Sequence, residues 1–319
     1  MNEATERLLL AYLSVEPPAP PAAGYGPLSP EAREIFWGTP DDPAPEILLG
    51  FREELYGRHY LRSDEKNHWT WIETLQGLGP CGAYAGVGTD QAYVFIGAMR
   101  PHLAWLADYD PWVVDLHRVY LAFFEEIAEI DRFIWVWEDR DEGRDWGRAL
   151  LERHFAGSPD LDELLFIYGR ADSNVAAQFE RTIAMAEAHD FPCYLTDQAT
   201  YDFVRDLVRA GRVRPVLANL LDEHALVAIG EASRQLGVPM RAFYMSNAES
   251  YWDYPDQFRT NIRAQYFDER SLIMRTQPHY PRNNDYAYSV QPAFDFLAWL
   301  ADDDVDNVYD FWPREHIED

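Results

Sequence analysis

Lysine and cysteine are nearly absent from this chain of 319 residues. Lys66 is its single lysine, and two cysteines, Cys81 and Cys193, are too few for a disulfide framework or a cysteine-based zinc site. The sequence also lacks an apolar run of 18 residues, the length that a membrane-spanning helix needs. Because no charged start leads into an apolar stretch, as it would in a secretory signal, we expect a cytoplasmic protein without membrane contact.

Positive charge is scarce in the chain as a whole. It contains 55 acidic residues against 27 lysines and arginines, which gives a net charge of −28. A field of this sign repels phosphate backbones and anionic lipid, so we expect no nucleic-acid partner. The nine histidines show no His-x-x-x-His or His-Glu-x-x-His spacing, so no metal site is predicted. A small molecule or a peptide is the expected ligand, and the oligomeric state is left open.

The pattern of prolines and charges divides the chain into three parts. Residues 1–54 contain an expected short helix over 2–14 and a proline-rich arm or cover over 16–46. Residues 55–301 carry the periodic apolar patterns and are predicted to form one domain. Residues 302–319 begin with three aspartates and are expected to be a solvated acidic tail.

Short apolar runs alternate with amphipathic helical patterns along the central part of the chain. Strands are predicted over 83–87, 102–107, 214–220, 240–245, 271–275 and 286–290. Helices are predicted between them, including one over 63–76, whereas 132–138 fits a strand or a helix. This order indicates an α/β fold with a doubly wound, mainly parallel sheet. The successive helices over about 140–210 are too long for one crossover and predict a helical insertion that forms a lid or cap.

A glycine turn is the most informative motif of the sequence. Gly86 and Gly88 follow the first predicted strand, and Asp108 ends the second strand 22 residues after Gly86. Glycines let the backbone turn sharply and approach a ligand, and an acid at that position accepts hydrogen bonds from ribose hydroxyls. The motif therefore predicts a nucleotide-type site, with a ligand-free strand-to-helix turn as the alternative. A backbone amide or Arg100 is the alternative partner of Asp108.

The residues around this turn favour one class of cofactor. A dinucleotide fingerprint has a third glycine where Gln91 stands, and Asp90 repels phosphate near the helix start. A ribose ligand with a cationic tail, such as S-adenosylmethionine, suits a site surrounded by Asp90, Asp108 and Asp110. The predicted cofactor-binding residues are Gly86, Gly88, Asp90, Gln91, Asp108 and Asn219.

Further polar residues follow the later strands and precede the first one. Ligands bind beyond the carboxyl ends of the strands in such sheets, so Asn219, Asp222 and the stretch from Ser246 to Glu249 are expected to lie at this edge. Asn247 is a candidate for holding a polar group of the substrate, and Glu249 is a candidate base. Asp64 and Glu65 are further candidate catalytic residues, with a charged first helical turn as the alternative. His117 is expected to be an interior histidine.

Several motifs together carry a resemblance to a known family. The stretches are Gly86-Val87-Gly88-x-x-Gln91 with Arg100-Pro101, Leu116-His117-x-x-Tyr120, Phe243-Tyr244-x-Ser246-Asn247-x-Glu249, and Ser63-Asp64-Glu65. They resemble a family of uncharacterised bacterial proteins over roughly residues 55–280. That family is similar in fold to class I S-adenosylmethionine-dependent methyltransferases, with a Rossmann-like domain. The resemblance implies that Gly86, Gly88 and Asp108 fall on cofactor positions, whereas Tyr84 replaces an acid that is usual there.

Three functions of different classes follow from these observations. The first is a methyltransferase-like enzyme that uses S-adenosylmethionine on a small molecule or a peptide. The second is a non-catalytic binding or scaffold protein whose cofactor site is degenerate, which Tyr84 and Asp90 favour. The third is a nicotinamide-dependent oxidoreductase, against which Gln91 argues. A fold by itself does not choose among them.

Overall fold

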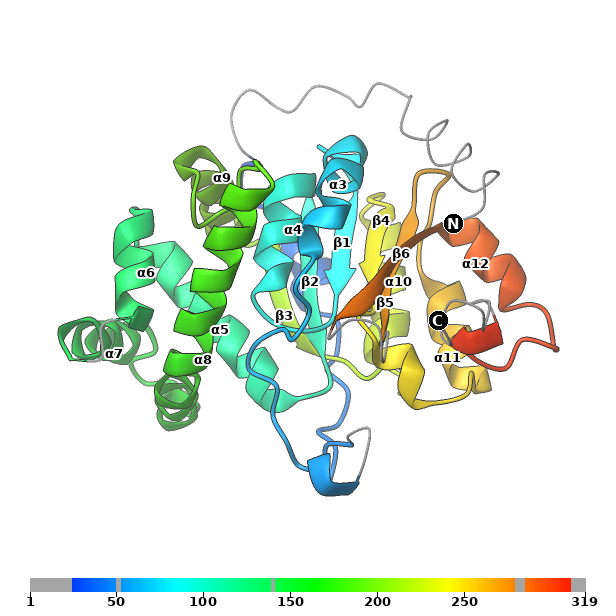
Figure 1. The fold of residues 1–319 in the computed structure, drawn as a ribbon, viewed down its shortest axis with the longest axis horizontal. Coiled ribbons are helices and arrows are strands. Elements are labelled where there is room, and N and C mark those ends of the chain that lie inside the picture. Colours follow the sequence, from blue (N-terminus) through cyan, green and yellow to red (C-terminus); the bar gives the residue numbers. More distant parts are fainter. Residues whose placement is uncertain (1–24, 50–52, 139–140, 279–284, 311–319) are drawn as a thin grey trace.

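A computed structural model describes residues 25–49, 53–138, 141–278 and 285–310 of the chain. It has the α/β architecture that the sequence predicts, built on one six-stranded sheet (Figure 1). The strands are β1 (Ala83–Gly86), β2 (Leu103–Asp108), β3 (Val213–Leu217), β4 (Met240–Tyr244), β5 (Leu272–Pro278) and β6 (Tyr286–Pro292). The expected helix over 2–14 lies outside the described residues.

The sheet has the order β3-β2-β1-β4-β5-β6, so the order of the strands reverses between β1 and β4. The first five strands are parallel and β6 is antiparallel to β5. Gly86, the last residue of β1, is in register with Leu106 of β2 and Tyr244 of β4. The carboxyl ends of three central strands therefore meet at one edge of the sheet, the lower edge in Figure 1.

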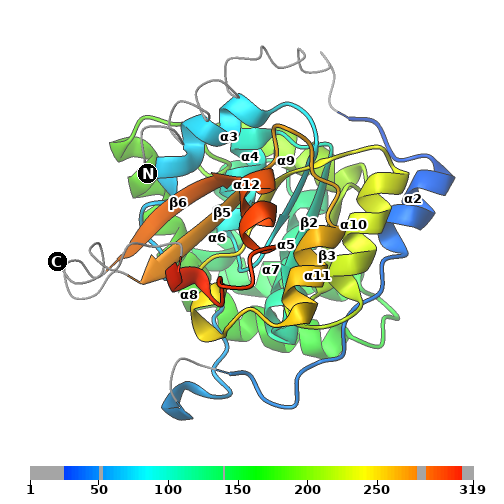
Figure 2. The ribbon, with the colours of Figure 1, turned by 90° about the vertical axis from the view of Figure 1, so that its right-hand side faces the viewer.

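Helices cover both faces of the sheet because the strands are buried on both sides. Tyr84 belongs to an aromatic-rich core on one face, and its neighbours Ala83 and Ala85 belong to a second core on the other face. Figure 2 shows the two sets of helices on opposite sides of the strands. The first face carries α3 (Ile72–Leu78), α4 (Gln91–Met99) and α5 (Pro111–Glu126). The second carries α2 (Pro30–Trp37), α10 (Ala225–Gln235), α11 (Asp256–Ala264) and α12 (Ala293–Trp299).

Further helices occupy the region where an insertion was predicted. They are α6 (Ile130–Glu138), α7 (Glu142–His154), α8 (Leu161–Ala188) and α9 (Gln198–Arg209). The ambiguous stretch 132–138 is thus helical. These helices pack against α5 and α4, as an outer layer on the first face of the sheet. The expectation of a lid across the strand ends is wrong for most of this region, but two parts of α8 reach that edge. Phe166 in its first turns contacts Trp112, and Arg181 further along donates to the Ser63 carbonyl.

Two local predictions need correction. The helix expected over 63–76 begins only at Ile72, after a 3-10 turn η2 (His68–Trp71), because Glu65 is drawn into a buried hydrogen-bond network instead of starting a helix. The acidic tail is not wholly solvated, since Val308 in η4 (Val308–Asp310) is fully buried. The proline-rich stretch covers the domain, one of the two roles predicted for it, because Phe36 of α2 lies in the core with its ring 4.8 Å from that of Trp105.

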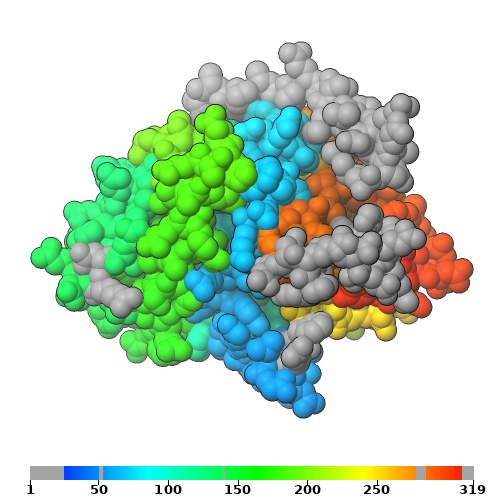
Figure 3. Space-filling view, viewed as in Figure 1, coloured from blue at the N-terminus to red at the C-terminus, as the bar shows by residue number. Residues whose placement is uncertain are grey.

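Two short 3-10 turns complete the described elements, η1 (Glu53–Leu55) and η3 (Ala248–Tyr251). In the space-filling view the chain between η1 and α3 runs up the first face as a blue strip between the green helix α8 and the orange strands (Figure 3). No helix in the described ranges combines the length and the apolar character needed to cross a bilayer.

The burial of Phe36 predicts that the arm contributes to stability. We expect Phe36→Ala to lower the free energy of unfolding by about 3–5 kcal/mol, because it removes a large side chain from a closed core. Leu49→Ala is the matched control in the same arm, since Leu49 is 59% exposed, and should change stability by less than about 0.5 kcal/mol. Urea unfolding followed by fluorescence measures both. Equal small effects would mean that the arm is not part of the folded domain.

Candidate functional site

The glycine turn leaves β1 at the edge where the strand order reverses. Gly88 has a positive φ of 93°, a conformation that glycine adopts without strain. A Cβ atom at Gly88 would lie 2.1 Å from Nε2 of Gln91. The Gln91 side chain donates from Nε2 to the Val87 carbonyl at 3.1 Å and accepts from the Thr89 amide at 3.0 Å. Gln91, predicted to bind cofactor, therefore closes the turn from inside.

Asp108 faces the glycine turn from the end of β2. Its Oδ2 accepts from the Gly88 amide at 2.8 Å and its Oδ1 accepts from the Asp110 amide at 2.9 Å. Burial of the carboxyl group raises the pKa of Asp108 to about 7, although these two amides favour the charged form. The backbone-amide alternative that the sequence left open is therefore realised. Each oxygen keeps a further lone pair with which it can accept a hydroxyl group.

A histidine from the preceding segment lies against the neighbouring acid. Nδ1 of His59 donates to both carboxylate oxygens of Asp110, at 2.9 and 3.0 Å. The imidazole also stacks on the indole of Trp112, with the ring centroids 3.6 Å apart and the planes 9° from parallel. Sequence reasoning missed His59, because nothing in its local sequence indicates a contact with the start of α5.

His117 holds the other side of the turn. Its Nε2 donates to the Gly88 carbonyl at 2.8 Å, so Nδ1 is the acceptor for the Tyr93 hydroxyl at 2.9 Å. Burial lowers the pKa of His117 to about 4, which keeps the ring neutral near pH 7. His117 is thus an interior histidine with both nitrogens satisfied, as the sequence predicted.

Glu65 forms a buried network at the carboxyl ends of β4 and β5. Its Oε1 accepts from Ser246 Oγ at 2.7 Å and from Thr276 Oγ1, and its Oε2 accepts from His68 Nε2 at 2.8 Å and from the Tyr244 hydroxyl. Burial by itself would raise the pKa of Glu65, but the hydrogen bond and charge of His68, with the hydroxyl groups of Thr276 and Tyr244, lower it. Ser246 has a positive φ of 53°, so the chain is strained where it meets this carboxylate.

Glu249 lies on the opposite face of the sheet from Glu65. Thr276 and Arg275 are successive residues of β5, so their side chains point to opposite faces, and Glu249 contacts Arg275 with Oε2 3.4 Å from Nε. Its Oε1 accepts from the Tyr254 hydroxyl at 2.6 Å. Burial raises the pKa of Glu249. The structure therefore separates these two predicted catalytic acids instead of bringing them together.

The remaining predicted residues lie at different distances from the turn. Asp64 is exposed and accepts from the Tyr286 hydroxyl at 2.6 Å. Asn247 is half-buried beside the Glu65 network, with its Oδ1 3.5 Å from Ser246 Oγ.

Asn219 follows β3, where its side chain accepts a hydrogen bond from the Leu221 amide and its own amide donates to Asp42. Asn219 therefore shapes a loop beside the arm. Asp90 is buried beneath α8, with 1% of its surface exposed.

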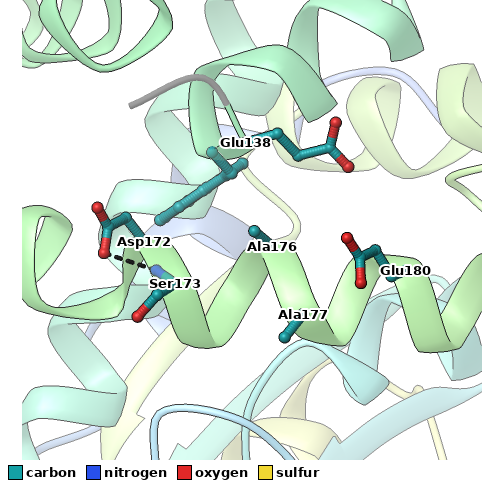
Figure 4. Close-up of a pocket in the computed structure, with 7 residues that line it drawn as sticks. Glu138, Asp172, Ser173, Ala176, Ala177 and Glu180 are labelled. Carbon is teal, nitrogen blue, oxygen red and sulfur yellow. Dashed lines mark hydrogen bonds between the residues drawn. The ribbon is translucent and has the colours of Figure 1, made fainter. Parts of the chain in front are cut away.

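Two cavities in the described structure have none of the predicted site residues in their lining. The first, of about 350 Å³, is an acidic groove between α6 and α8, where Glu138 faces Glu180 across a floor of small residues (Figure 4). The second, of about 380 Å³, lies between the arm, α5 and the edge strand β3. Among the described residues no group of three or more histidine, cysteine or acidic side chains has an arrangement suited to a metal ion.

A comparison with known protein families shows which family the chain belongs to. A family described as Domain of unknown function (DUF7790) matches residues 60–318. The chain belongs to this family. The DUF7790 match includes all six strands and the helices of the first face, whereas α2 and His59 precede it. A search of curated proteins found no match.

The two buried glutamates predict opposite pH dependences. A lowered pKa means that Glu65 stabilises the fold above about pH 4.3 and that this contribution is lost as the pH falls, so Glu65→Gln should cost more at pH 7 than at pH 4. The pKa of Glu249 is raised, so its contribution is present at low pH and lost as the pH rises. Glu249→Gln should therefore cost more at pH 4 than at pH 7.

Chemical denaturation of both variants at the two pH values measures this difference. We expect Glu65→Gln to cost about 3 kcal/mol at pH 7, because the amide places a donor opposite groups that already donate. The same pH trend in both variants would contradict the opposite environments of the two carboxylates.

Proposed function

We propose that this protein binds S-adenosylmethionine at the glycine turn and transfers its methyl group to a small molecule or a peptide. One observation carries the proposal. The carboxylate of Asp108 faces the Gly88 turn at the end of β2, beside the point where the strand order reverses. Ligands of doubly wound sheets bind at this point, with an acid in that position on the ribose. A cytoplasmic location is part of the proposal.

The arrangement of the strands supports it. The order β3-β2-β1-β4-β5-β6 is the order of doubly wound nucleotide-binding sheets, with β6 reversed in direction. We therefore propose a Rossmann-like, methyltransferase-like fold for residues 55–301. Residues 302–310 pack against this domain through Val308.

Electrostatics favours this cofactor over a dinucleotide. Asp90, Asp108 and Asp110 are acidic groups near the turn, and burial raises the pKa of each. A pyrophosphate would meet carboxylates here, whereas a sulfonium cation would be attracted by them. The cofactor supplies an electrophilic methyl group, and the protein needs to hold it in line with the acceptor atom. Asp108 would accept a hydrogen bond from a ribose hydroxyl group and would keep the hydrogen bonds from its two backbone amides.

The geometry separates the candidate catalytic residues into proposed substrate contacts and residues that hold the structure. Glu65 has four hydrogen-bond donors and a lowered pKa, so it positions Ser246 and the end of β4 and is a poor base. Asn247 and Asp64 are more accessible on the same face and are the proposed contacts of the substrate. Glu249, in its buried contact with Arg275 on the other face, has a structural role in this proposal.

A non-catalytic binding or scaffold protein is the second candidate, and specific contacts favour it. Gln91 fills the turn, His59 occupies the face of Trp112, and the Tyr84 hydroxyl lies 2.2 Å from where a Cβ atom of Gly86 would be. The protein's own side chains thus fill space that a cofactor would use. A nicotinamide-dependent oxidoreductase is less well supported, because the acids near the turn oppose a pyrophosphate.

Calorimetric titration with S-adenosylmethionine, S-adenosylhomocysteine and NAD tests these alternatives. We expect the two adenosyl ligands to bind at pH 8, and Asp108→Asn to weaken them about tenfold or more through lost hydrogen bonds. Asp206→Asn on the exposed side of α9 is the matched control and should bind normally. Binding of NAD alone would favour the oxidoreductase, and binding of no ligand would favour the scaffold protein.

The contact of His59 with Trp112 predicts a second effect on affinity. If the adenosyl ring system uses the indole face, it must displace His59, so His59→Ala should tighten binding about threefold to tenfold. His189→Ala is the matched control, because His189 stacks on Trp69 with centroids 3.9 Å apart but lies elsewhere. A weaker affinity of His59→Ala would show instead that the imidazole contacts the ligand.

A further inference from the structure

A group of polar side chains is buried where the start of α4, α5, α8 and the loop before α9 meet, and we call this group the chamber. We define it by Asp90, Tyr120, Arg181 and Tyr194. Asp90 is 1% exposed, and the two tyrosines are fully buried. Oδ2 of Asp90 and the hydroxyl groups of Tyr120 and Tyr194 have no hydrogen-bond partner in the described structure. Such groups are costly inside a protein, so three of them in one region indicate a bound polar species.

Arg181 provides the positive side of the chamber. From α8 it donates through Nη2 to the Ser63 carbonyl at 2.9 Å and to Oε1 of Gln178, while its buried Nε has no partner. Asp90 and Arg181 are close enough for the charge of each to shift the pKa of the other. They are nevertheless not among the ion pairs within 4.0 Å in the described residues. Two opposite charges thus face the same interior without contact.

The surroundings of Asp90 suit an ammonium group. Its other oxygen, Oδ1, accepts from Thr89 Oγ1 at 3.3 Å. The ring of Tyr93 lies 5.2 Å from that of Tyr120 and 5.8 Å from that of Tyr194, so aromatic rings pack together beside Asp90. Carboxylates and aromatic rings both attract a cation. Burial raises the pKa of Asp90 to about 6, so the carboxylate is mostly charged at pH 8.

Water would satisfy the hydrogen bonds of these groups, whereas a ligand with an ammonium group and a carboxylate would also bring an opposite charge against Asp90 and against Arg181. We propose that the chamber binds an α-amino carboxylate group, with its ammonium on Asp90 and the tyrosine hydroxyls and its carboxylate on Arg181. Arg62, whose charge acts on Arg181, adds to the field that attracts the carboxylate. Arg181 is only partly buried beside Ser63, and this is the side from which the group would enter.

Two kinds of ligand carry an α-amino carboxylate group. One is the amino-acid end of the adenosyl cofactor, and in that form the inference rests on the proposed function, because Asp90 follows the glycine turn directly. The other is a free amino acid. Binding measurements on the full chain separate them with three probes: S-adenosylhomocysteine, 5′-methylthioadenosine, which lacks the α-amino carboxylate, and L-methionine, extended to the other common amino acids.

We expect S-adenosylhomocysteine to bind at least about tenfold more tightly than 5′-methylthioadenosine, since charge-assisted hydrogen bonds are lost in the latter. Asp90→Asn and Arg181→Gln should remove this difference and leave the affinity for 5′-methylthioadenosine unchanged. Tyr194→Phe, which removes one hydroxyl group and keeps the packing, should reduce the difference about threefold or more. Asp206→Asn and Arg209→Gln on α9 are the matched controls and should behave as the natural protein does.

Each other outcome has a definite meaning. Equal affinities for the two adenosyl probes, or variants that weaken both equally, would overturn the chamber assignment and leave the proposed function intact. Binding of an amino acid that depends on Asp90 and Arg181, without binding of either adenosyl probe, would support the chamber and refute the proposed cofactor. Binding of none of the probes would overturn both. Melting curves at pH 8 check that each variant is folded.

Discussion

The buried carboxylate of Glu65 is the interaction on which the candidate site depends. A charged group in the interior needs several donors, and Glu65 obtains them from η2, the end of β4, the loop after β4 and β5 itself. These bonds attach the segment before α3 to the carboxyl edge of the sheet. The Tyr288 hydroxyl strengthens the attachment, because it accepts from the amides of Lys66 and Asn67 at 2.8 Å. The position of this segment then brings His59 to Trp112 and Ser63 to Arg181.

Acidic groups are concentrated inside the molecule as well as on its surface. Burial raises the pKa of Asp90, Asp108 and Asp110, whereas Glu65 is held charged by its donors. This difference follows from the number and kind of hydrogen-bond donors around each carboxylate. Acids that are poorly compensated near a glycine turn are the physical basis for expecting a ligand with positive charge there. The same reasoning distinguishes Asp108, which has two backbone amides, from Asp90, whose Oδ2 has none.

The periodic segments were predictable because each is decided by local patterns. The apolar runs at 83–87 and 102–107 became β1 and β2 within about a residue, and the mainly parallel α/β sheet followed from their alternation with helices. The sequence did not decide whether 132–138 is a strand or a helix, since its aromatic residues suit the periodicity of both. The start at Ser63 was misread, because a residue sequence typical of a helix N-terminus was overridden by the long-range bonds of Glu65. The packing of α2 was missed for the same reason, since Phe36 finds its partner, Trp105, far along the chain.

The sequence by itself determined the α/β fold class, the glycine turn with its facing acid, and a cysteine content too low for a disulfide framework, because these depend on composition and on short spacings. Only the tertiary structure decided which polar residues lie close to one another. It put Glu65 and Glu249 on opposite faces of the sheet, since neighbouring residues of β5 point in opposite directions. It also brought His59 to Asp110 and Arg181 to the neighbourhood of Asp90, contacts between segments whose separation along the chain hides them from any local pattern.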